Sequence, residues 1–178
     1  PGAGKTSFMR AGVIPRLRQQ SELVVLQLRP GSKPFLSLAA VIEALRSSAD
    51  LDTTTDTIPD FQWCDHDDGV NRGPVRRSQL STSGHKAKAL AKKFRETPAV
   101  LGQELREAAE EEESQILLFV DQLEELLTDV SDPEERTAFL ELLCRAADDP
   151  QDSVRVVLCL RDDSLGHLAS SPIVREGL

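Results

Sequence analysis

The sequence predicts a three-layer α/β/α sandwich built on a parallel β-sheet, and three observations lead to this fold class. Short apolar segments, typical of strands buried on both faces, alternate with longer segments whose apolar residues recur at helical spacing. This alternation implies parallel pairing through right-handed crossovers. The chain has 178 residues, enough for one domain with a single core, and its 39% hydrophobic content excludes a disordered chain.

The first part of the chain, 1–46, contains one predicted strand between two predicted helices. The first helix should start near Lys5 and end at Pro15, because proline disfavours helix at the residue before it. A run of Val and Leu at 23–28 predicts a buried strand, and Pro34 suits the first turn of the second helix. The apolar residues of that helix recur at Phe35, Leu38, Ile42 and Leu45.

The middle of the chain, 47–98, has a different composition. Asp, Thr, Ser, Gly and Pro dominate, and a basic patch extends over 72–95. We expect an exposed polar insert with one helix at 86–95, whose role the sequence leaves open. The basic residues could contact nucleic acid or an acidic partner, but they lack aromatic side chains for base stacking, so a solvated surface is favoured. Cys64 and His66 could bind a metal, but no second pair follows at zinc spacing, and a metal site is disfavoured.

The last part, 99–178, shows the alternation most clearly. We expect a helix at 99–113, a strand at 116–120, a helix capped by Asp132 and a strand at 154–160. The buried face of the capped helix should consist of Phe139, Leu142, Leu143 and Ala146.

The charge and cysteine content narrow the classes of protein. A net charge of −9 argues against a general nucleic-acid binder or a basic membrane-surface module. The cysteines are too few and scattered for a disulfide framework, so we interpret Cys144 and Cys159 as small buried thiols of a protein in a reducing compartment. No apolar run reaches membrane-spanning length and no signal peptide opens the chain. These observations predict a piece of a longer cytoplasmic protein.

A phosphate-binding motif opens the chain. Pro1-Gly2-Ala3-Gly4-Lys5-Thr6 matches the last six positions of the Walker A pattern G-x-x-x-x-G-K-[ST]. Small residues let successive backbone N–H groups turn toward phosphates, and the helix that follows adds its positive dipole end. Lys5 would bind the β- and γ-phosphates of a nucleotide and Thr6 would ligate Mg²⁺. The predicted nucleotide-binding residues are Gly2, Ala3, Gly4, Lys5, Thr6 and Ser7. The alternative is a surface turn of the same composition.

A second motif follows 115 residues after Thr6. The apolar strand at 116–120 ends in Asp121, which is the Walker B arrangement, and its carboxylate should lie at the carboxyl edge of the sheet, where ligands bind in open α/β folds. There Asp121 can hold Mg²⁺ opposite Thr6. Glu124 or Glu125 could orient the attacking water as a general base. The alternatives are a helix N-cap for Asp121 and a solvated helix face for the two glutamates.

Arg161 follows the last predicted strand directly. A polar residue at this position faces the γ-phosphate in many P-loop ATPases, and an arginine would compensate its charge during hydrolysis. The alternative is an arginine at a strand end that pairs with Asp162 or Asp163.

Four segments resemble one family. The helix following Walker A (6–17), the end of the second strand (28–31), the Walker B segment Asp121-Gln122-Leu123-Glu124-Glu125-Leu126-Leu127-Thr128 and the last strand with its arginine (157–161) are similar to the STAND class of signal-transduction ATPases. The chain is most similar to the novel STAND NTPase 1 group, which is AAA-like, related to NACHT proteins and often fused to β-propeller repeats. The chain departs from the group at Asp162 and Ser164, where a small apolar and an aromatic residue are usual.

This resemblance implies an ATP-dependent switch. It implies a cofactor, ATP or ADP with Mg²⁺, and a parallel sheet of strand order 5-1-4-3-2 whose first strand precedes the chain. Such proteins are held as monomers with ADP, exchange it for ATP and self-associate through the NTPase module, while fused sensor or effector domains lie outside this chain. Because the first strand is interior in that order, we expect residues 1–178 alone to be unstable and inactive, and the ATPase activity to belong to a longer chain.

Other functions compete with the switch. The protein could be a scaffold that binds nucleotide for stability and hardly hydrolyses it. A motor or loader acting on nucleic acid is disfavoured by the acidic charge. A small-molecule kinase is the weakest alternative, because the two glutamates after Walker B suit water activation better.

Overall fold

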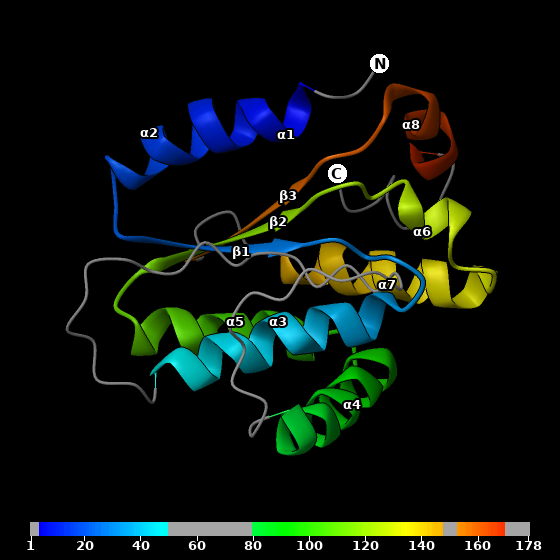
Figure 1. Cartoon of the computed structure of the whole chain (residues 1–178), viewed down its shortest axis with the longest axis horizontal. Helices are drawn as coiled ribbons and strands as arrows, with labels where there is room; N and C mark the ends of the chain where they lie inside the picture. Colours follow the sequence, from blue (N-terminus) through cyan, green and yellow to red (C-terminus); the bar gives the residue numbers. More distant parts are fainter. Residues whose placement is uncertain (1–3, 50–79, 148–152, 170–178) are drawn as a thin grey trace.

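The computed structural model describes residues 4–49, 80–147 and 153–169, and its centre is a parallel β-sheet (Figure 1). The strands β1 (Leu23–Leu28), β2 (Gln115–Val120) and β3 (Val154–Leu158) pair in the order β1-β2-β3. In register, Leu23 lies opposite Gln115 and Ile116 lies opposite Val154. The predicted α/β class with a parallel sheet is therefore confirmed.

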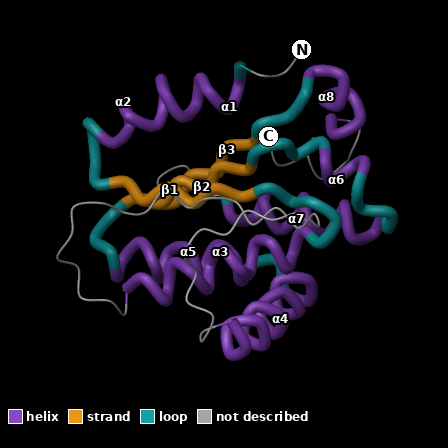
Figure 2. The backbone as a smooth tube through the Cα atoms, viewed as in Figure 1, coloured by secondary structure: helices purple, strands orange, loops and turns teal. Residues whose placement is uncertain are grey.

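Helices lie on both sides of this sheet (Figures 1 and 2). One side carries a continuous helix made of α1 (Lys5–Phe8), a π-helical segment η1 (Met9–Val13) and α2 (Ile14–Arg18). The other side carries α3 (Pro34–Ala49), α5 (Val100–Glu111) and α7 (Pro133–Ala146), with α4 (Leu80–Glu96) packed outside them. Two short helices, α6 (Glu125–Thr128) and α8 (Asp162–Ala169), follow β2 and β3.

The hydrophobic core is unequal on the two sides. On the side of α3, α5 and α7 it is deep, and the rings of Phe35 and Phe139 meet edge to face with centroids 5.3 Å apart. On the side of α1 and α2, the buried cluster among the described residues consists of Ile14, Leu23 and Leu117. The helix that begins at the phosphate-loop motif thus rests on a thin apolar layer.

Several boundaries agree with the sequence analysis. The strand predicted at 23–28 is β1, and the helix predicted from Pro34 is α3. Asp132 caps α7, its Oδ1 accepting the N–H of Glu134 at 3.0 Å. The four residues predicted for the buried face of α7 are all buried. The last strand is shorter than predicted, because β3 ends at Leu158 rather than at residue 160.

The first helix does not end at Pro15, as predicted, but continues to Arg18. Pro15 lies in the first turn of α2, directly after the π-helical segment η1. A proline has no N–H to donate and its ring crowds the carbonyl one turn earlier. The wider π-helical turn stands where the regular hydrogen-bond ladder would be interrupted, and the helix continues beyond it.

The helix within the polar middle segment is longer and more buried than predicted. The expected helix at 86–95 is α4, which begins at Leu80, and its Ala87, Leu90 and Phe94 belong to the hydrophobic core. Phe94 is fully buried. These positions follow helical spacing (i, i+3, i+7), so the apolar pattern decided the packing although the composition is basic. Residues 50–79 of this segment, with Cys64 and His66, lie outside the described residues.

A buried carboxylate also ties α4 to its neighbours. Glu104 on α5 is 7% exposed and forms ion pairs with Arg46 on α3 and Lys93 on α4.

Within the described ranges, no helix is both long enough and apolar enough to span a bilayer.

Candidate functional site at the carboxyl end of the sheet

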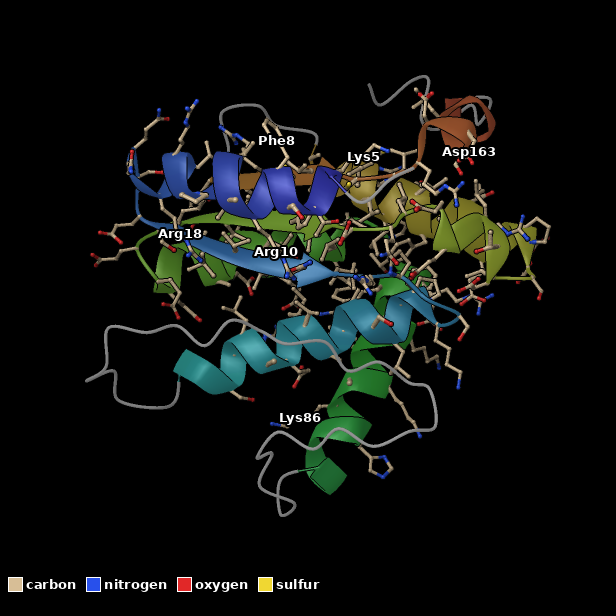
Figure 3. All side chains as sticks on the ribbon, turned by 45° about the horizontal axis from the view of Figure 1, so that its top comes forward. Lys5, Phe8, Arg10, Arg18, Lys86 and Asp163 are labelled. Atoms are coloured by element: carbon tan, nitrogen blue, oxygen red, sulfur yellow. The ribbon has the colours of Figure 1, made fainter. Side chains whose placement is uncertain are left out.

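Polar side chains converge where the three parallel strands end. Arg29 follows β1, Asp121 follows β2 and Cys159 follows β3. The start of α1 lies at the same end. In Figure 3, Lys5 lies toward the end of the molecule that carries Asp163 on α8, whereas Arg18 lies at the opposite end. Parallel strands bring their carboxyl ends to one edge, which explains why residues far apart in the sequence meet here.

The two predicted nucleotide-binding motifs are in direct contact. The Thr6 hydroxyl lies 2.9 Å from Oδ1 and 3.0 Å from Oδ2 of Asp121, across 115 residues of sequence. The backbone N–H of Asp121 donates to the carbonyl of Leu28 at 2.8 Å and continues the β1–β2 ladder. Asp121 is only 1% exposed. The structure therefore brings together the hydroxyl and the carboxylate that the sequence analysis paired as metal ligands.

The other Walker A residues are placed in part. Gly4 forms the turn before α1 and its carbonyl accepts the N–H of Phe8 at 2.8 Å. Lys5 and Ser7 are exposed on the first turn of the helix. Gly2 and Ala3 lie outside the described residues.

The oxygen donors at this site fit magnesium. A hydroxyl and a carboxylate are hard oxygen ligands, and Mg²⁺ is usually bound by one or two protein groups together with substrate phosphates and water. Thr6 and Asp121 offer this set at one point. Nowhere in the described part of the chain do three or more His, Cys, Asp or Glu side chains gather as a metal cluster.

The two glutamates that follow Asp121 point to opposite neighbours. Glu124 accepts the backbone N–H of Arg161 through Oε2 at 3.2 Å, next to the end of β3. Glu125 accepts the backbone N–H of Gly31 through Oε2 at 3.2 Å, next to the end of β1. Gly31 has a φ of 57°, a left-handed conformation that favours glycine. The acidic pair therefore joins both neighbouring strand ends to the segment after Walker B.

Burial distinguishes Glu125 electrostatically. Desolvation raises the pKa of its carboxyl group above the ordinary value, and the nearby Asp129 and Glu124 add to this. The N–H of Gly31 and the charge of Arg29 oppose the shift by stabilising the carboxylate.

Arg161 makes the contact that the sequence analysis named as its alternative. Its guanidinium lies 2.7 Å from Oδ2 of Asp163, and 53% of the side chain is exposed. A pair this exposed contributes little to stability. In this arrangement the guanidinium is engaged by α8.

Sequence reasoning missed Arg29 and Gln122. The guanidinium of Arg29 lies 3.9 Å from Oδ2 of Asp121. Gln122 adopts a left-handed φ of 56°, and with its amide oriented by its neighbours, its oxygen accepts from Arg29 at 3.2 Å and its nitrogen donates to Glu125. A signal existed in the sequence, because Arg29 directly follows a buried parallel strand, as Asp121 does.

Cys159 also differs from its prediction as an ordinary buried thiol. The residue is half-buried, just beyond the end of β3, and its thiol lies near the carboxylate of Asp121. Burial raises the pKa of this thiol, the charge of Asp121 raises it further, and Lys5 lowers it. The thiol therefore lies close to the carboxylate of the predicted metal-ligand pair.

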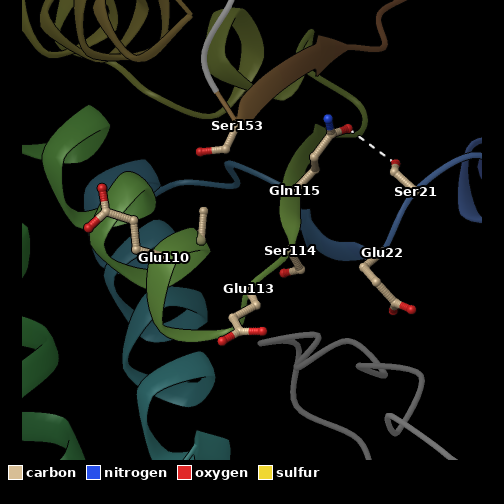
Figure 4. Close-up of a pocket in the computed structure, with 8 residues that line it drawn as sticks. Ser21, Glu22, Glu110, Glu113, Ser114, Gln115 and Ser153 are labelled. Carbon is tan, nitrogen blue, oxygen red and sulfur yellow. Dashed lines mark hydrogen bonds between the residues drawn. The ribbon is translucent and has the colours of Figure 1, made fainter.

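A shallow pocket at the amino end of the sheet offers different chemistry (Figure 4). Its lining residues include Glu22, Glu110, Glu113 and Ser114, and the Ser21 hydroxyl donates to Gln115 Oε1 at 3.2 Å across it. No lysine or arginine lines this pocket among the described residues. The pocket is therefore a poor site for phosphate, and we place the candidate site at the carboxyl end.

The sequence was compared with known proteins. The family model for Novel STAND NTPase 1 matches residues 1–178. Comparisons with curated proteins and with solved structures found no match. The family match covers the whole sequence, including the residues that meet at the carboxyl end of the sheet. The chain belongs to the Novel STAND NTPase 1 family.

Proposed function

We propose that this chain is the ATP-binding and ATP-hydrolysing module of a multidomain signalling switch. The observation that carries the proposal is the contact between the Thr6 hydroxyl and the Asp121 carboxylate, at 2.9 and 3.0 Å. Two motifs separated by 115 residues can meet because both contribute to one ligand site, or they can meet by chance. Membership in a family of NTPases favours the first explanation.

The arrangement of the strands supports the P-loop NTPase topology. Strands 2, 3 and 4 are adjacent in the order 5-1-4-3-2. The observed order β1-β2-β3 is the same if these strands take those three places. In that reading β2 carries Walker B and β3 carries the arginine that senses the γ-phosphate.

In the proposed mechanism, Lys5 and the N–H groups at the start of α1 bind the phosphates. Thr6 and Asp121 would hold Mg²⁺, whose charge would offset that of the nucleotide phosphates. A glutamate orients the attacking water and accepts its proton. Arg161 leaves Asp163 and compensates the charge that develops on the γ-phosphate.

We assign the activation of the attacking water to Glu124. Glu124 accepts the backbone N–H of Arg161 at 3.2 Å, next to the end of β3 and to the arginine that we assign to the γ-phosphate. Glu125 lies on the other side, with Arg29, and its two carboxylate oxygens face Gly31 and Gln122. A raised pKa would suit Glu125 as a base, but position decides before pKa does.

In the switch we propose, nucleotide state controls self-association. Both glutamates bind the backbone of neighbouring loops, Glu124 at Arg161 and Glu125 at Gly31. A change at the γ-phosphate that moves Glu124 would therefore move the segment leading into α8. This gives a physical route from bound nucleotide to the surface of the domain.

The same hydrogen bonds favour a second candidate function, a scaffold stabilised by nucleotide. If Glu124 and Glu125 serve only to fix loops, the protein binds nucleotide without appreciable hydrolysis. Turnover separates the two functions: a switch has measurable ATPase activity that Glu124→Gln abolishes, whereas a scaffold has almost none to lose.

The deciding experiment is nucleotide binding by the purified full-length protein, measured by calorimetry with ATP and ADP, with and without Mg²⁺. We expect micromolar, Mg²⁺-dependent binding that Lys5→Ala abolishes. The matched control is Lys86→Ala, because Lys86 is exposed on α4, on the far side of the sheet from Lys5 (Figure 3). Absence of binding by a folded wild-type protein would contradict both candidate functions.

A further inference from the structure

Asp121 carries a negative charge in a place where water cannot solvate it. Its side chain is 1% exposed, and a buried carboxylate is costly unless a positive charge or hydrogen-bond donors compensate it. The Thr6 hydroxyl has a single proton to share between the two carboxylate oxygens. Another source of compensation is needed.

Arg29 provides that compensation. Its guanidinium lies 3.9 Å from Oδ2 of Asp121, and its side chain is 28% exposed, so the ion pair is partly shielded from solvent. Arg29 reaches Asp121 because β1 and β2 are adjacent and parallel, with Leu28 paired to Val120. The residues that follow these two partners are Arg29 and Asp121.

A divalent metal at Asp121 would compete with this arginine. Mg²⁺ held by Asp121 and Thr6 would place two positive charges next to Arg29, at a distance where like charges repel strongly. Two cations would then claim a single carboxylate.

Arg29 has other acceptors within reach. The side-chain oxygen of Gln122 accepts from it at 3.2 Å, and the charge of Arg29 already acts on Glu125. The left-handed φ of 56° at Gln122 is uncommon for a residue with a side chain, and it places this amide between Arg29 and Glu125.

We propose that Arg29 is the counter-ion of Asp121 in the metal-free domain and that Mg²⁺ displaces it toward Gln122 and Glu125 when nucleotide binds. The inference rests on the proposed function, because it takes Asp121 as the metal-binding carboxylate. It makes Arg29 a positioning residue that transmits occupancy of the metal site to the loop at Gly31, which Glu125 holds.

Thermal unfolding of the purified protein tests the exchange. Arg29→Gln should lower the melting temperature by about 3–6 °C in EDTA, because Asp121 loses its counter-ion. With saturating Mg²⁺ and ADP the difference from wild type should largely disappear, because the metal replaces the missing charge. The matched control is Arg145→Gln, which removes an exposed ion pair with Glu141 on α7 and should change both conditions equally and little.

A titration with Mg²⁺ at fixed ADP gives a second readout. Arg29→Gln should bind Mg²⁺ about three- to tenfold more tightly than wild type, because no arginine has to be displaced. Weaker Mg²⁺ binding would overturn the exchange and make Arg29 an aid to metal binding. An equal loss of melting temperature with and without Mg²⁺ and ADP would reduce Arg29 to a structural residue.

A double-mutant cycle covers the case in which Arg29→Gln does not fold in EDTA. In an Asp121→Asn background no buried charge remains to be compensated, so adding Arg29→Gln should cost little stability there. An undiminished cost in that background would overturn the proposal. Failure of the wild type to bind Mg²⁺ and ADP would instead reject the proposed function, and the exchange with it.

Discussion

The two ends of the parallel sheet differ in what their polar residues do. At the carboxyl end, Thr6, Arg29 and Asp121 come from distant parts of the chain and contact one another. At the amino end there is a shallow pocket, but its glutamates lie around it without a cation among the described lining residues (Figure 4). Complementary groups that converge at one point therefore identify a site for a charged ligand better than a hollow in the surface does.

Replacing one carboxylate at each end of the sheet should give the largest difference in nucleotide binding. Asp121→Asn keeps the size of the side chain but removes the charge that would hold Mg²⁺, and we expect Mg²⁺-dependent ATP binding to weaken by a factor on the order of 100. Glu110→Gln, in the amino-end pocket, should leave the binding constant unchanged. Equal losses from both variants in calorimetry would contradict the placement of the site.

The two glutamates at the carboxyl end of the sheet should differ in their effect on ATP turnover. Glu124→Gln should reduce ATP turnover on the order of 100-fold or more, as expected for loss of a general base, with little change in ATP affinity. Glu125→Gln can still accept the N–H of Gly31 through its amide oxygen, so turnover should fall far less. The reverse ranking in a phosphate-release assay would reassign the base to Glu125.

The smallest expected effect concerns stability and pH. Burial raises the pKa of Glu125 above its ordinary value of 4.5, so the folded protein binds this proton more tightly than the unfolded chain. The group therefore lowers stability as pH rises from about 4.5 through the folded-state pKa. Glu125→Gln should make the protein slightly more stable than wild type at pH 7, by no more than about 2 °C in melting temperature.

Melting curves at pH 4 and pH 7 check this sign. At pH 4 the advantage of Glu125→Gln should vanish, because the wild-type carboxyl group is then protonated in both states. Glu110→Gln serves as the exposed control. A variant less stable than wild type at pH 7 would show that the carboxylate stabilises the loop at Gly31 by more than its burial costs.

The parts of the fold that follow from local pattern could be predicted from the sequence. Strand β1 has the predicted bounds 23–28, because a run of Val and Leu between polar residues has few other uses. Asp132 was recognisable as a cap from its position before Pro133. Asp121 and Thr6 were predicted to face one metal, and they do meet.

The failures have two physical causes. At α4 the basic composition led to the prediction of an exposed helix, although the spacing of Ala87, Leu90 and Phe94 gives this helix an apolar face that is buried. Local rules also ignored the rest of the molecule. Pro15 was expected to end the first helix, but the helix continues to Arg18. Arg29 was given no role, because its partner Asp121 lies 92 positions away in the sequence. Such contacts become visible once the strand order is known.

The thin apolar layer beneath the helix Lys5–Arg18 has a mechanical consequence. Its buried cluster among the described residues is Ile14, Leu23 and Leu117, whereas the opposite face of the sheet is fastened by the deep core. Shifting this helix would expose less apolar surface than shifting any helix of the deep layer. We therefore expect this helix to shift against the sheet more easily than the helices of the deep core. Lys5 and Thr6 lie on this helix and Asp121 lies at the end of β2, so a shift of the helix against the sheet would act first on the contact between Thr6 and Asp121.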